Sequence, residues 1–124
     1  MRGGHQMEHS SLEQNQTDGL QIGRSVYNMN FRRLTSAGCS VALRFQLDHV
    51  LRVLVQNEGQ VVSREELIEI VWNGNYCTGP KALTHSICKL RKIFAILGDD
   101  DTQIVTVPKF GYSLCTTTTN EVFI

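Results

Sequence analysis

The stretch PKALTHSICKLRKIFAIL, residues 80–97, decides the fold because its pattern predicts one long amphipathic helix. Pro80 suits the first position of a helix, where its missing N–H group costs nothing. The large apolar residues then step by four, three, four and three positions, which confines them to an arc of about 80° around the helix. They are Leu83, Ile87, Leu90, Phe94 and Leu97. We therefore expect this helix to pack against a core along one face.

The opposite face of the same helix is cationic. It collects Lys81, His85, Cys88, Lys89 and Lys92, with Thr84 and Arg91 at its edge. No acidic residue occurs between Lys81 and Leu97, although Asp99 to Asp101 follow directly. A helix with side chains is about 10–12 Å across and fits a DNA major groove about 12 Å wide. The pattern favours a helix that can enter this groove, although a basic outer face is often only solvated surface.

Two further helices are predicted upstream. Residues 45–56 carry apolar side chains at helical spacing and end near Gly59, which suits a left-handed cap. Ser63 and Glu66 form an S-x-x-E capping box that begins a short second helix ending at Trp72. In that helix we expect Leu67, Ile70 and Val71 to face the core. The Asn- and Gly-containing segment 73–79 then connects it to the third helix.

Strand patterns flank the helices on both sides. Apolar residues between Ile22 and Leu43, interrupted by turn signals, predict three short antiparallel strands. After the helices, residues 104–107 and 112–114 predict a hairpin with a tight turn at 108–111. The expected fold class is α+β: an N-terminal antiparallel sheet, a three-helix core and a C-terminal β-hairpin. We expect flexible tails at 1–20 and 116–124 around one domain at 21–115.

Composition narrows the function classes. The chain has 124 residues, with 12 basic and 12 acidic side chains and hence no net charge, so any DNA-binding charge must be local. We expect no metal site, because neither the four cysteines nor the four histidines are spaced as zinc ligands. We also expect no cofactor and no enzymatic activity, since phosphate-binding loops and nucleophile motifs are missing. Without an apolar run of about 18 residues, we expect a cytoplasmic protein with no membrane segment.

Three segments in order resemble the winged helix-turn-helix domain of OmpR/PhoB-type regulators. They are VVSREELIEIVW at 61–72, LTHSICKLRK at 83–92 and VTVPKFGYSL at 105–114. The closing TVPK and GY are most similar to the ToxR/CadC-like branch, and the resemblance covers the chain from near Ile22 to Leu114. It implies a winged helix-turn-helix fold and a bacterial-type transcriptional regulator that binds specific double-stranded DNA. The helix at about 80–97 would lie in the major groove, and the wing at about 104–114 near the minor groove or the backbone.

The resemblance also implies individual contacts. Lys81 falls at a phosphate-contacting position, Lys89 at a base-reading position, and Arg91 at the arginine that tends to contact phosphate. Trp72 falls where the family places an indole near the backbone, whereas Thr106 and Lys109 belong to the wing. Thr84, His85 and Lys92 are supported mainly by the face of the helix on which they lie. Each residue also has a structural alternative, which is core packing for Trp72 and solvation for His85 and Lys92.

Departures from the family pattern leave other hypotheses open. Cys88 and Ser86 replace larger or more polar residues, and Phe110 stands where ToxR-like wings usually carry Arg. These changes suggest weaker DNA binding that relies on a homodimer or a partner regulator. One alternative is a winged-helix interaction module that modulates another regulator without strong DNA binding of its own. Another is a thiol sensor at Cys88, and the segment 73–79 resembles a loop that can touch RNA polymerase. Whether the chain is a stand-alone regulator or a fragment stays open.

Overall fold

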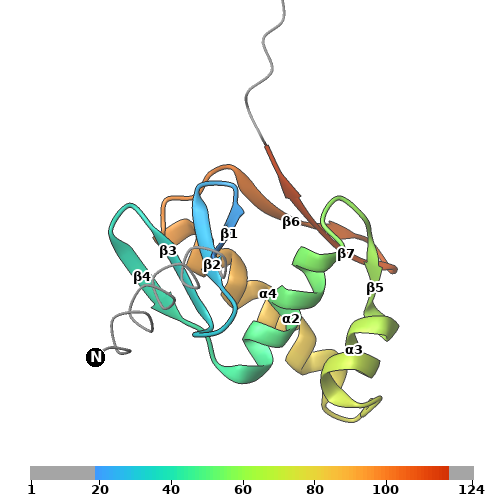
Figure 1. Cartoon of the computed structure of the whole chain (residues 1–124). Helices are drawn as coiled ribbons and strands as arrows, with labels where there is room; N and C mark the ends of the chain where they lie inside the picture. The colour runs from blue at the N-terminus through green and yellow to red at the C-terminus, as the bar shows by residue number, and fades with distance from the viewer. Residues whose placement is uncertain (1–18, 118–124) are drawn as a thin grey trace, which may run out of the picture.

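The computed structural model describes residues 19–117, so most of both expected tails lies outside the described residues. Seven strands and three helices occur within this range, and Figure 1 shows the helices between two antiparallel sheets. The N-terminal sheet has the order β1-β2-β3-β4, made by Gly19–Ile22, Ser25–Asn28, Arg33–Ser36 and Cys39–Ala42. This arrangement confirms the expected α+β class.

The N-terminal sheet has four strands rather than the three that the sequence pattern predicted. The extra hairpin arises at Gly23, whose φ of +54° permits a tight turn between β1 and β2. The prediction rested on the apolar residues between Ile22 and Leu43, but these residues do not all lie in strands or in the core. In the structure Ile22, Tyr27 and Leu34 are buried, but Val26 and Phe31 are exposed. Phe31 lies in the connection between β2 and β3, so it was not a strand residue.

The helices are α2 (Phe45–Gln56), α3 (Arg64–Trp72) and α4 (Gly79–Ile96), close to the predicted bounds. The Oγ of Ser63 accepts a hydrogen bond from the N–H of Glu66 at 3.0 Å, which confirms the N-cap of α3. The five apolar residues predicted for this helix, four within α4 and Leu97 at its C-cap, are all buried, at most 4% exposed. With the buried side chains of α2 they form one core shared by both sheets.

One predicted core residue of α3 is exposed. Ile70 is 45% exposed, whereas its neighbour Ile68 is 2% exposed and takes the core position. The start of α4 explains the difference. A Cβ on Gly79 would lie 2.8 Å from Cγ2 of Ile68, so the glycine makes room for the Ile68 side chain. Helical spacing alone does not show which side of a two-turn helix meets its neighbours.

The C-terminal sheet has the order β5-β7-β6 and contains the predicted hairpin, β6 (Thr102–Val107) and β7 (Gly111–Thr116). Its third strand, β5 (Val62–Ser63), precedes α3 and was not predicted. A Cβ on Gly111 would overlap the carbonyl oxygen of Val62, so only glycine permits the β5–β7 approach. The base of the hairpin is thereby fixed to the start of α3.

Candidate nucleic-acid interface

The outer face of α4 carries the cationic residues as predicted. Lys81, His85, Lys89 and Lys92 are all exposed, as are Thr84 and Cys88. Within residues 79–98 no acidic side chain accompanies them. The apolar face of α4 is buried, so the helix cannot turn these side chains inward without exposing its core residues. The lysines are thus free to meet an external anion.

A shallow hollow of about 640 Å³ lies along this face. Its lining includes Pro80, Thr84, Cys88, Lys92 and, from α3, Arg64. No acidic residue lines it. The Thr84 hydroxyl donates to the carbonyl oxygen of Pro80 at 3.1 Å, so it is partly engaged by its own helix. Arg64, Lys81, Lys89 and Lys92 place positive charge along the hollow, which favours a polyanion along α4.

Arg91 joins α4 to the hairpin. Its Nε and Nη2 donate to the carbonyl oxygen of Ile104 at 3.1 and 2.6 Å, and Nη2 also donates to Oγ1 of Thr106 at 2.7 Å. Arg91 remains exposed, and its Nη1 makes no hydrogen bond to any part of the chain that the structure describes. The residue therefore fixes the hairpin beside the helix and still presents N–H groups outward.

Arg64 makes a second link of this kind, which the sequence analysis missed. Its Nη1 donates to the hydroxyl of Tyr112 at 2.8 Å, and its Nη2 donates to the carbonyl oxygen of Pro80 at 3.1 Å. The backbone N–H of Arg64 also donates to the carbonyl oxygen of Phe110 at 2.9 Å. A cation in the first turn of a helix opposes the helix dipole, and this unfavourable position was a signal that Arg64 has an external role. We call Arg64 and Arg91 the arginine links.

The N-terminal sheet is attached by buried acids instead. Asp48 of α2 is 3% exposed; it accepts a short hydrogen bond from the Tyr27 hydroxyl and another from Nη2 of Arg52 at 3.0 Å. Burial, followed by the hydrogen bond to Asp48 and its charge, raises the pKa of Tyr27 well above its ordinary value. Tyr27 is therefore a neutral donor that joins β2 to α2.

Asp99 makes the second acidic attachment, just after α4. Its carboxylate accepts hydrogen bonds from the Ser25 hydroxyl at 2.6 Å, the Arg24 N–H at 3.1 Å and the Thr102 hydroxyl at 2.9 Å. Burial opposes ionisation, but these hydrogen bonds outweigh it and hold the pKa of Asp99 below its ordinary value. We call Asp48 and Asp99 the acidic links; both serve the sheet and neither lines the hollow along α4.

A family profile described as "Transcriptional regulatory protein, C terminal" matches residues 40–114. The chain belongs to this family. The transcriptional activator CadC of Escherichia coli K12 is 32% identical over 96 residues, which cover 77% of this chain and 19% of CadC. The regulatory protein TrcR of Mycobacterium tuberculosis is 30% identical over 105 residues, covering 85% of this chain and 40% of TrcR. The chain thus spans less than half of either relative.

Solved structures confirm the winged helix-turn-helix fold. The DNA-binding domain of E. coli CadC superposes with a TM-score of 0.65 at 33% identity, covering 76% of this chain and 88% of that domain. The C-terminal domain of the nisin resistance regulator NsrR gives a TM-score of 0.63 at 29% identity, covering 77% and 94%. These likenesses confirm the resemblance to OmpR/PhoB-type and CadC-like regulators. In the terms of this family, α4 is the recognition helix and β6–β7 is the wing.

The remaining residues predicted to contact DNA differ in how far they are exposed to solvent. Lys109 is exposed in the turn of the wing at a φ of +64°, and Thr106 is exposed while accepting from Arg91. Trp72 closes α3 but is 9% exposed and belongs to the core, so little of it reaches solvent. Phe110, in contrast, is 52% exposed beside Lys109.

Between residues 19 and 117, no helix is both long enough and apolar enough to cross a bilayer. The same residues contain no group of three or more His, Cys, Asp or Glu side chains arranged to hold a metal ion.

Proposed function

We propose that this winged-helix domain binds specific sequences of double-stranded DNA and thereby regulates transcription. The recognition helix α4 would lie in the major groove, with Lys89 and His85 toward the bases and Lys81, Lys92 and Arg91 toward phosphates. The wing would bring Thr106 and Lys109 to the backbone or the adjacent minor groove. The observation that carries this proposal is the split of α4 into a buried apolar face and an exposed, acid-free cationic face.

The family supports the same function. CadC and NsrR are named as a transcriptional activator and a resistance regulator, and the matching part of CadC is a DNA-binding domain. The wing geometry adds a physical reason. Because Arg91 hydrogen-bonds to Ile104 and Thr106, the wing is held at a fixed position beside α4. Helix and wing can then contact DNA as one preorganised surface.

The direct test is selection of bound sequences from a randomised duplex pool, followed by affinity measurements across a range of salt concentrations. The selected site should bind with an affinity that falls steeply as salt rises, because phosphate contacts release counterions. Lys89→Glu should weaken binding about tenfold or more, a cost of about 1.4 kcal/mol. Arg33→Glu makes the same charge change at an exposed position of the N-terminal sheet and is the matched control. Equal affinities for the two variants would contradict the proposed interface.

A second candidate function is suggested by Phe110. A large apolar side chain, 52% exposed at the tip of the wing, is suited to protein contact. The domain would then modulate another regulator, or form a homodimer, without strong DNA binding of its own. Sedimentation of the purified chain tests for the homodimer, and DNA affinity measured across salt concentrations tests for DNA binding. A Phe110-dependent dimer together with weak, salt-independent DNA binding would favour the interaction module.

RNA polymerase is a further candidate partner. The segment 73–79 leads into α4 and exposes Tyr76 at 51%, which supports a proposed contact with RNA polymerase while α4 is on DNA. A cytoplasmic location and a non-enzymatic role are consistent with a DNA ligand. Crosslinking at Tyr76 in a promoter complex would test the polymerase contact.

A further inference from the structure

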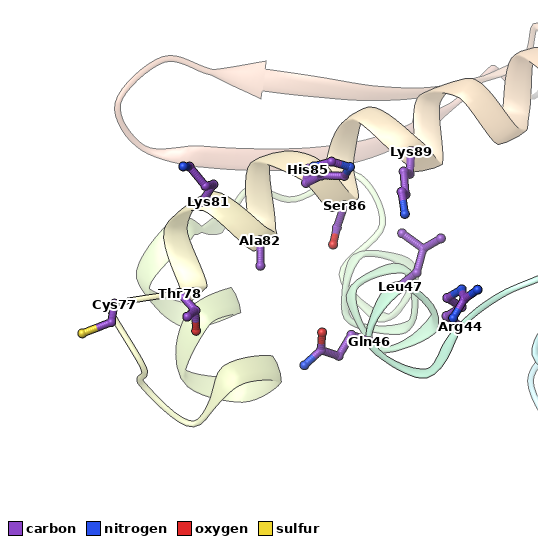
Figure 2. Close-up of a pocket in the computed structure, with 10 residues that line it drawn as sticks. All are labelled: Arg44, Gln46, Leu47, Cys77, Thr78, Lys81, Ala82, His85, Ser86 and Lys89. Carbon is purple, nitrogen blue, oxygen red and sulfur yellow. The ribbon is translucent and has the colours of Figure 1, made fainter.

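A second hollow, of about 470 Å³, lies on the other side of the cationic row of α4. It is formed between α4 and the start of α2. Figure 2 shows Ala82, Ser86 and Lys89 pointing from α4 toward this space, which Leu47 and Arg44 of the α2 start face from the other side. Its volume lies within the range of about 300–1,000 Å³ that is usual for small-molecule sites.

The hollow combines apolar and positively charged side chains. Leu47 and Ala82 supply apolar walls, while Arg44, Lys81 and Lys89 supply three cations. No acidic residue lines it. Gln46, Thr78 and Ser86 add side chains that donate or accept hydrogen bonds. A flat apolar group between the walls, with a carboxylate toward the cations, would satisfy each of these surfaces.

Arg44 gives an independent reason to expect an anion here. It occupies the N-cap position of α2 without a side-chain hydrogen bond to the helix. Its guanidinium is therefore available to a carboxylate bound in the hollow. The guanidinium and the Lys89 ammonium also favour an aromatic ring over an aliphatic chain, because cations are attracted to ring faces.

The two hollows share one row of residues. Lys81, His85 and Lys89 lie at successive fourth positions along α4, and all three line both hollows. They separate the DNA-facing side of α4 from the side that faces α2. In Figure 2 Lys89 is directed toward Leu47, on the α2 side. A ligand there would pair with Lys89 and so withdraw its charge from DNA.

We propose that the hollow between α2 and α4 binds a small aromatic carboxylate, and that this ligand competes with DNA for the Lys81–His85–Lys89 row. The site would be the point at which a metabolite signal reaches the regulator. The competitive part of this inference rests on the proposed DNA-binding function, whereas binding of the carboxylate itself does not. The size of the hollow and the three cations beside apolar walls favour a small ligand over a protein segment.

The test uses 2-naphthoate as the probe and the uncharged naphthalene-2-methanol as its control. The full chain, labelled with nitrogen-15, is titrated with each compound and followed by amide NMR shifts. We expect saturable shifts at Leu47, Ala82 and Ser86 with 2-naphthoate, and affinity at least tenfold lower for the alcohol. Shifts spread over the whole surface, or equal affinity for acid and alcohol, would overturn the proposal.

A pair of variants separates occupancy of the hollow from general effects on the helix. Ala82→Trp fills the hollow and should lower 2-naphthoate affinity at least tenfold. Ala95→Trp places the same side chain at an exposed position of α4 outside the hollow and should leave the affinity unchanged. Circular dichroism of both variants shows that each is folded. Wild-type affinity in folded Ala82→Trp would overturn the assignment of the site.

The competition experiment distinguishes failure of this inference from failure of the proposed function. DNA affinity is measured first without 2-naphthoate. If the chain does not bind DNA at all, that result contradicts only the proposed function. With DNA binding present, 2-naphthoate at ten times its dissociation constant should weaken apparent DNA affinity about tenfold, as expected for mutual exclusion. Unchanged DNA affinity at saturating 2-naphthoate would overturn the competitive role of the shared row.

Discussion

The N-terminal sheet and the wing are attached to the helical core by side chains of opposite charge. The sheet depends on the acidic links, Asp48 and Asp99, which are each 3% exposed and accept hydrogen bonds from two or more donors. The wing depends on the arginine links, Arg64 and Arg91, which keep part of their surface in solvent. One region is fixed by buried anions, and the other by cations at the surface.

This difference explains how a chain with no net charge can present a cationic face. Both linking acids are buried on the sheet side, where their charges are compensated locally by hydroxyl, amide and guanidinium donors. Both linking arginines adjoin the recognition helix, where any unused N–H adds to the positive field. Structural attachment and ligand attraction therefore use the same residues on the wing side but separate residues on the sheet side.

The largest effect is expected for Gly111→Ala, at the base of the wing. The added methyl group would overlap the carbonyl oxygen of Val62 and separate β7 from β5, which should cost about 4 kcal/mol of unfolding free energy. Gly38→Ala is the control: its φ is +82° but no atom lies within 4 Å of the added group, so only strain of about 1–2 kcal/mol applies. Urea unfolding of both variants measures the difference. Equal costs would show that the β5–β7 approach does not constrain the wing.

Asp48→Ala should break the attachment of the N-terminal sheet. It leaves the Tyr27 hydroxyl and Arg52 without their carboxylate, at a cost of about 3 kcal/mol. Asp101→Ala removes only an exposed pair with Arg24 and should cost less than about 1 kcal/mol. The protein that remains folded should bind DNA with unchanged affinity, because this link lies away from α4's outer face. A large loss of DNA affinity in folded Asp48→Ala would remove the distinction between the two regions.

Arg91→Met should affect DNA affinity more than stability, the reverse of Asp48→Ala. Stability should fall by only about 1 kcal/mol, because the lost hydrogen bonds are partly exposed, but DNA affinity should fall about tenfold. Arg91→Lys should recover little, since an ammonium cannot reproduce the paired bonds to Ile104 and Thr106. Arg24→Met removes an exposed arginine on the sheet side and should leave DNA affinity unchanged. If Arg24→Met and Arg91→Met weaken DNA binding equally, the wing link has no special role.

The smallest effect concerns acid stability. Because the pKa of Asp99 is lowered in the folded state, its ionised form contributes stability at neutral pH, and this contribution disappears as pH falls below about 3.9. Asp99→Asn should therefore be less stable than wild type at pH 7 but show a shallower loss at low pH. Asp100→Asn, at the exposed neighbouring position, should follow the wild-type profile. Unfolding midpoints in urea at pH 7 and pH 3 give the comparison.

The sequence predicted the elements whose signal is local. The apolar spacing of Leu83, Ile87 and Leu90 defined α4, and the Ser63 cap defined the start of α3, because both depend on neighbours within a turn or two. The turn residues at 108–111 likewise predicted the hairpin. The predictions failed where a distant contact decides the outcome: Ile70 is exposed because Ile68 packs under Gly79.

The candidate interface likewise contains some residues that the sequence predicts and others that only tertiary contacts place. Exposure of Lys81, Lys89 and Lys92 follows from helical periodicity, since fixing one face of α4 inward turns the opposite face outward. The sequence shows that Arg64 lies in the first turn of α3, but it does not show its partners, Pro80 and Tyr112, because they lie 16 and 48 residues farther along the chain. The hollow beside Arg44 likewise exists only where α2 crosses α4. Periodicity determines which way a side chain points from its own axis, but only packing of several elements determines what it meets.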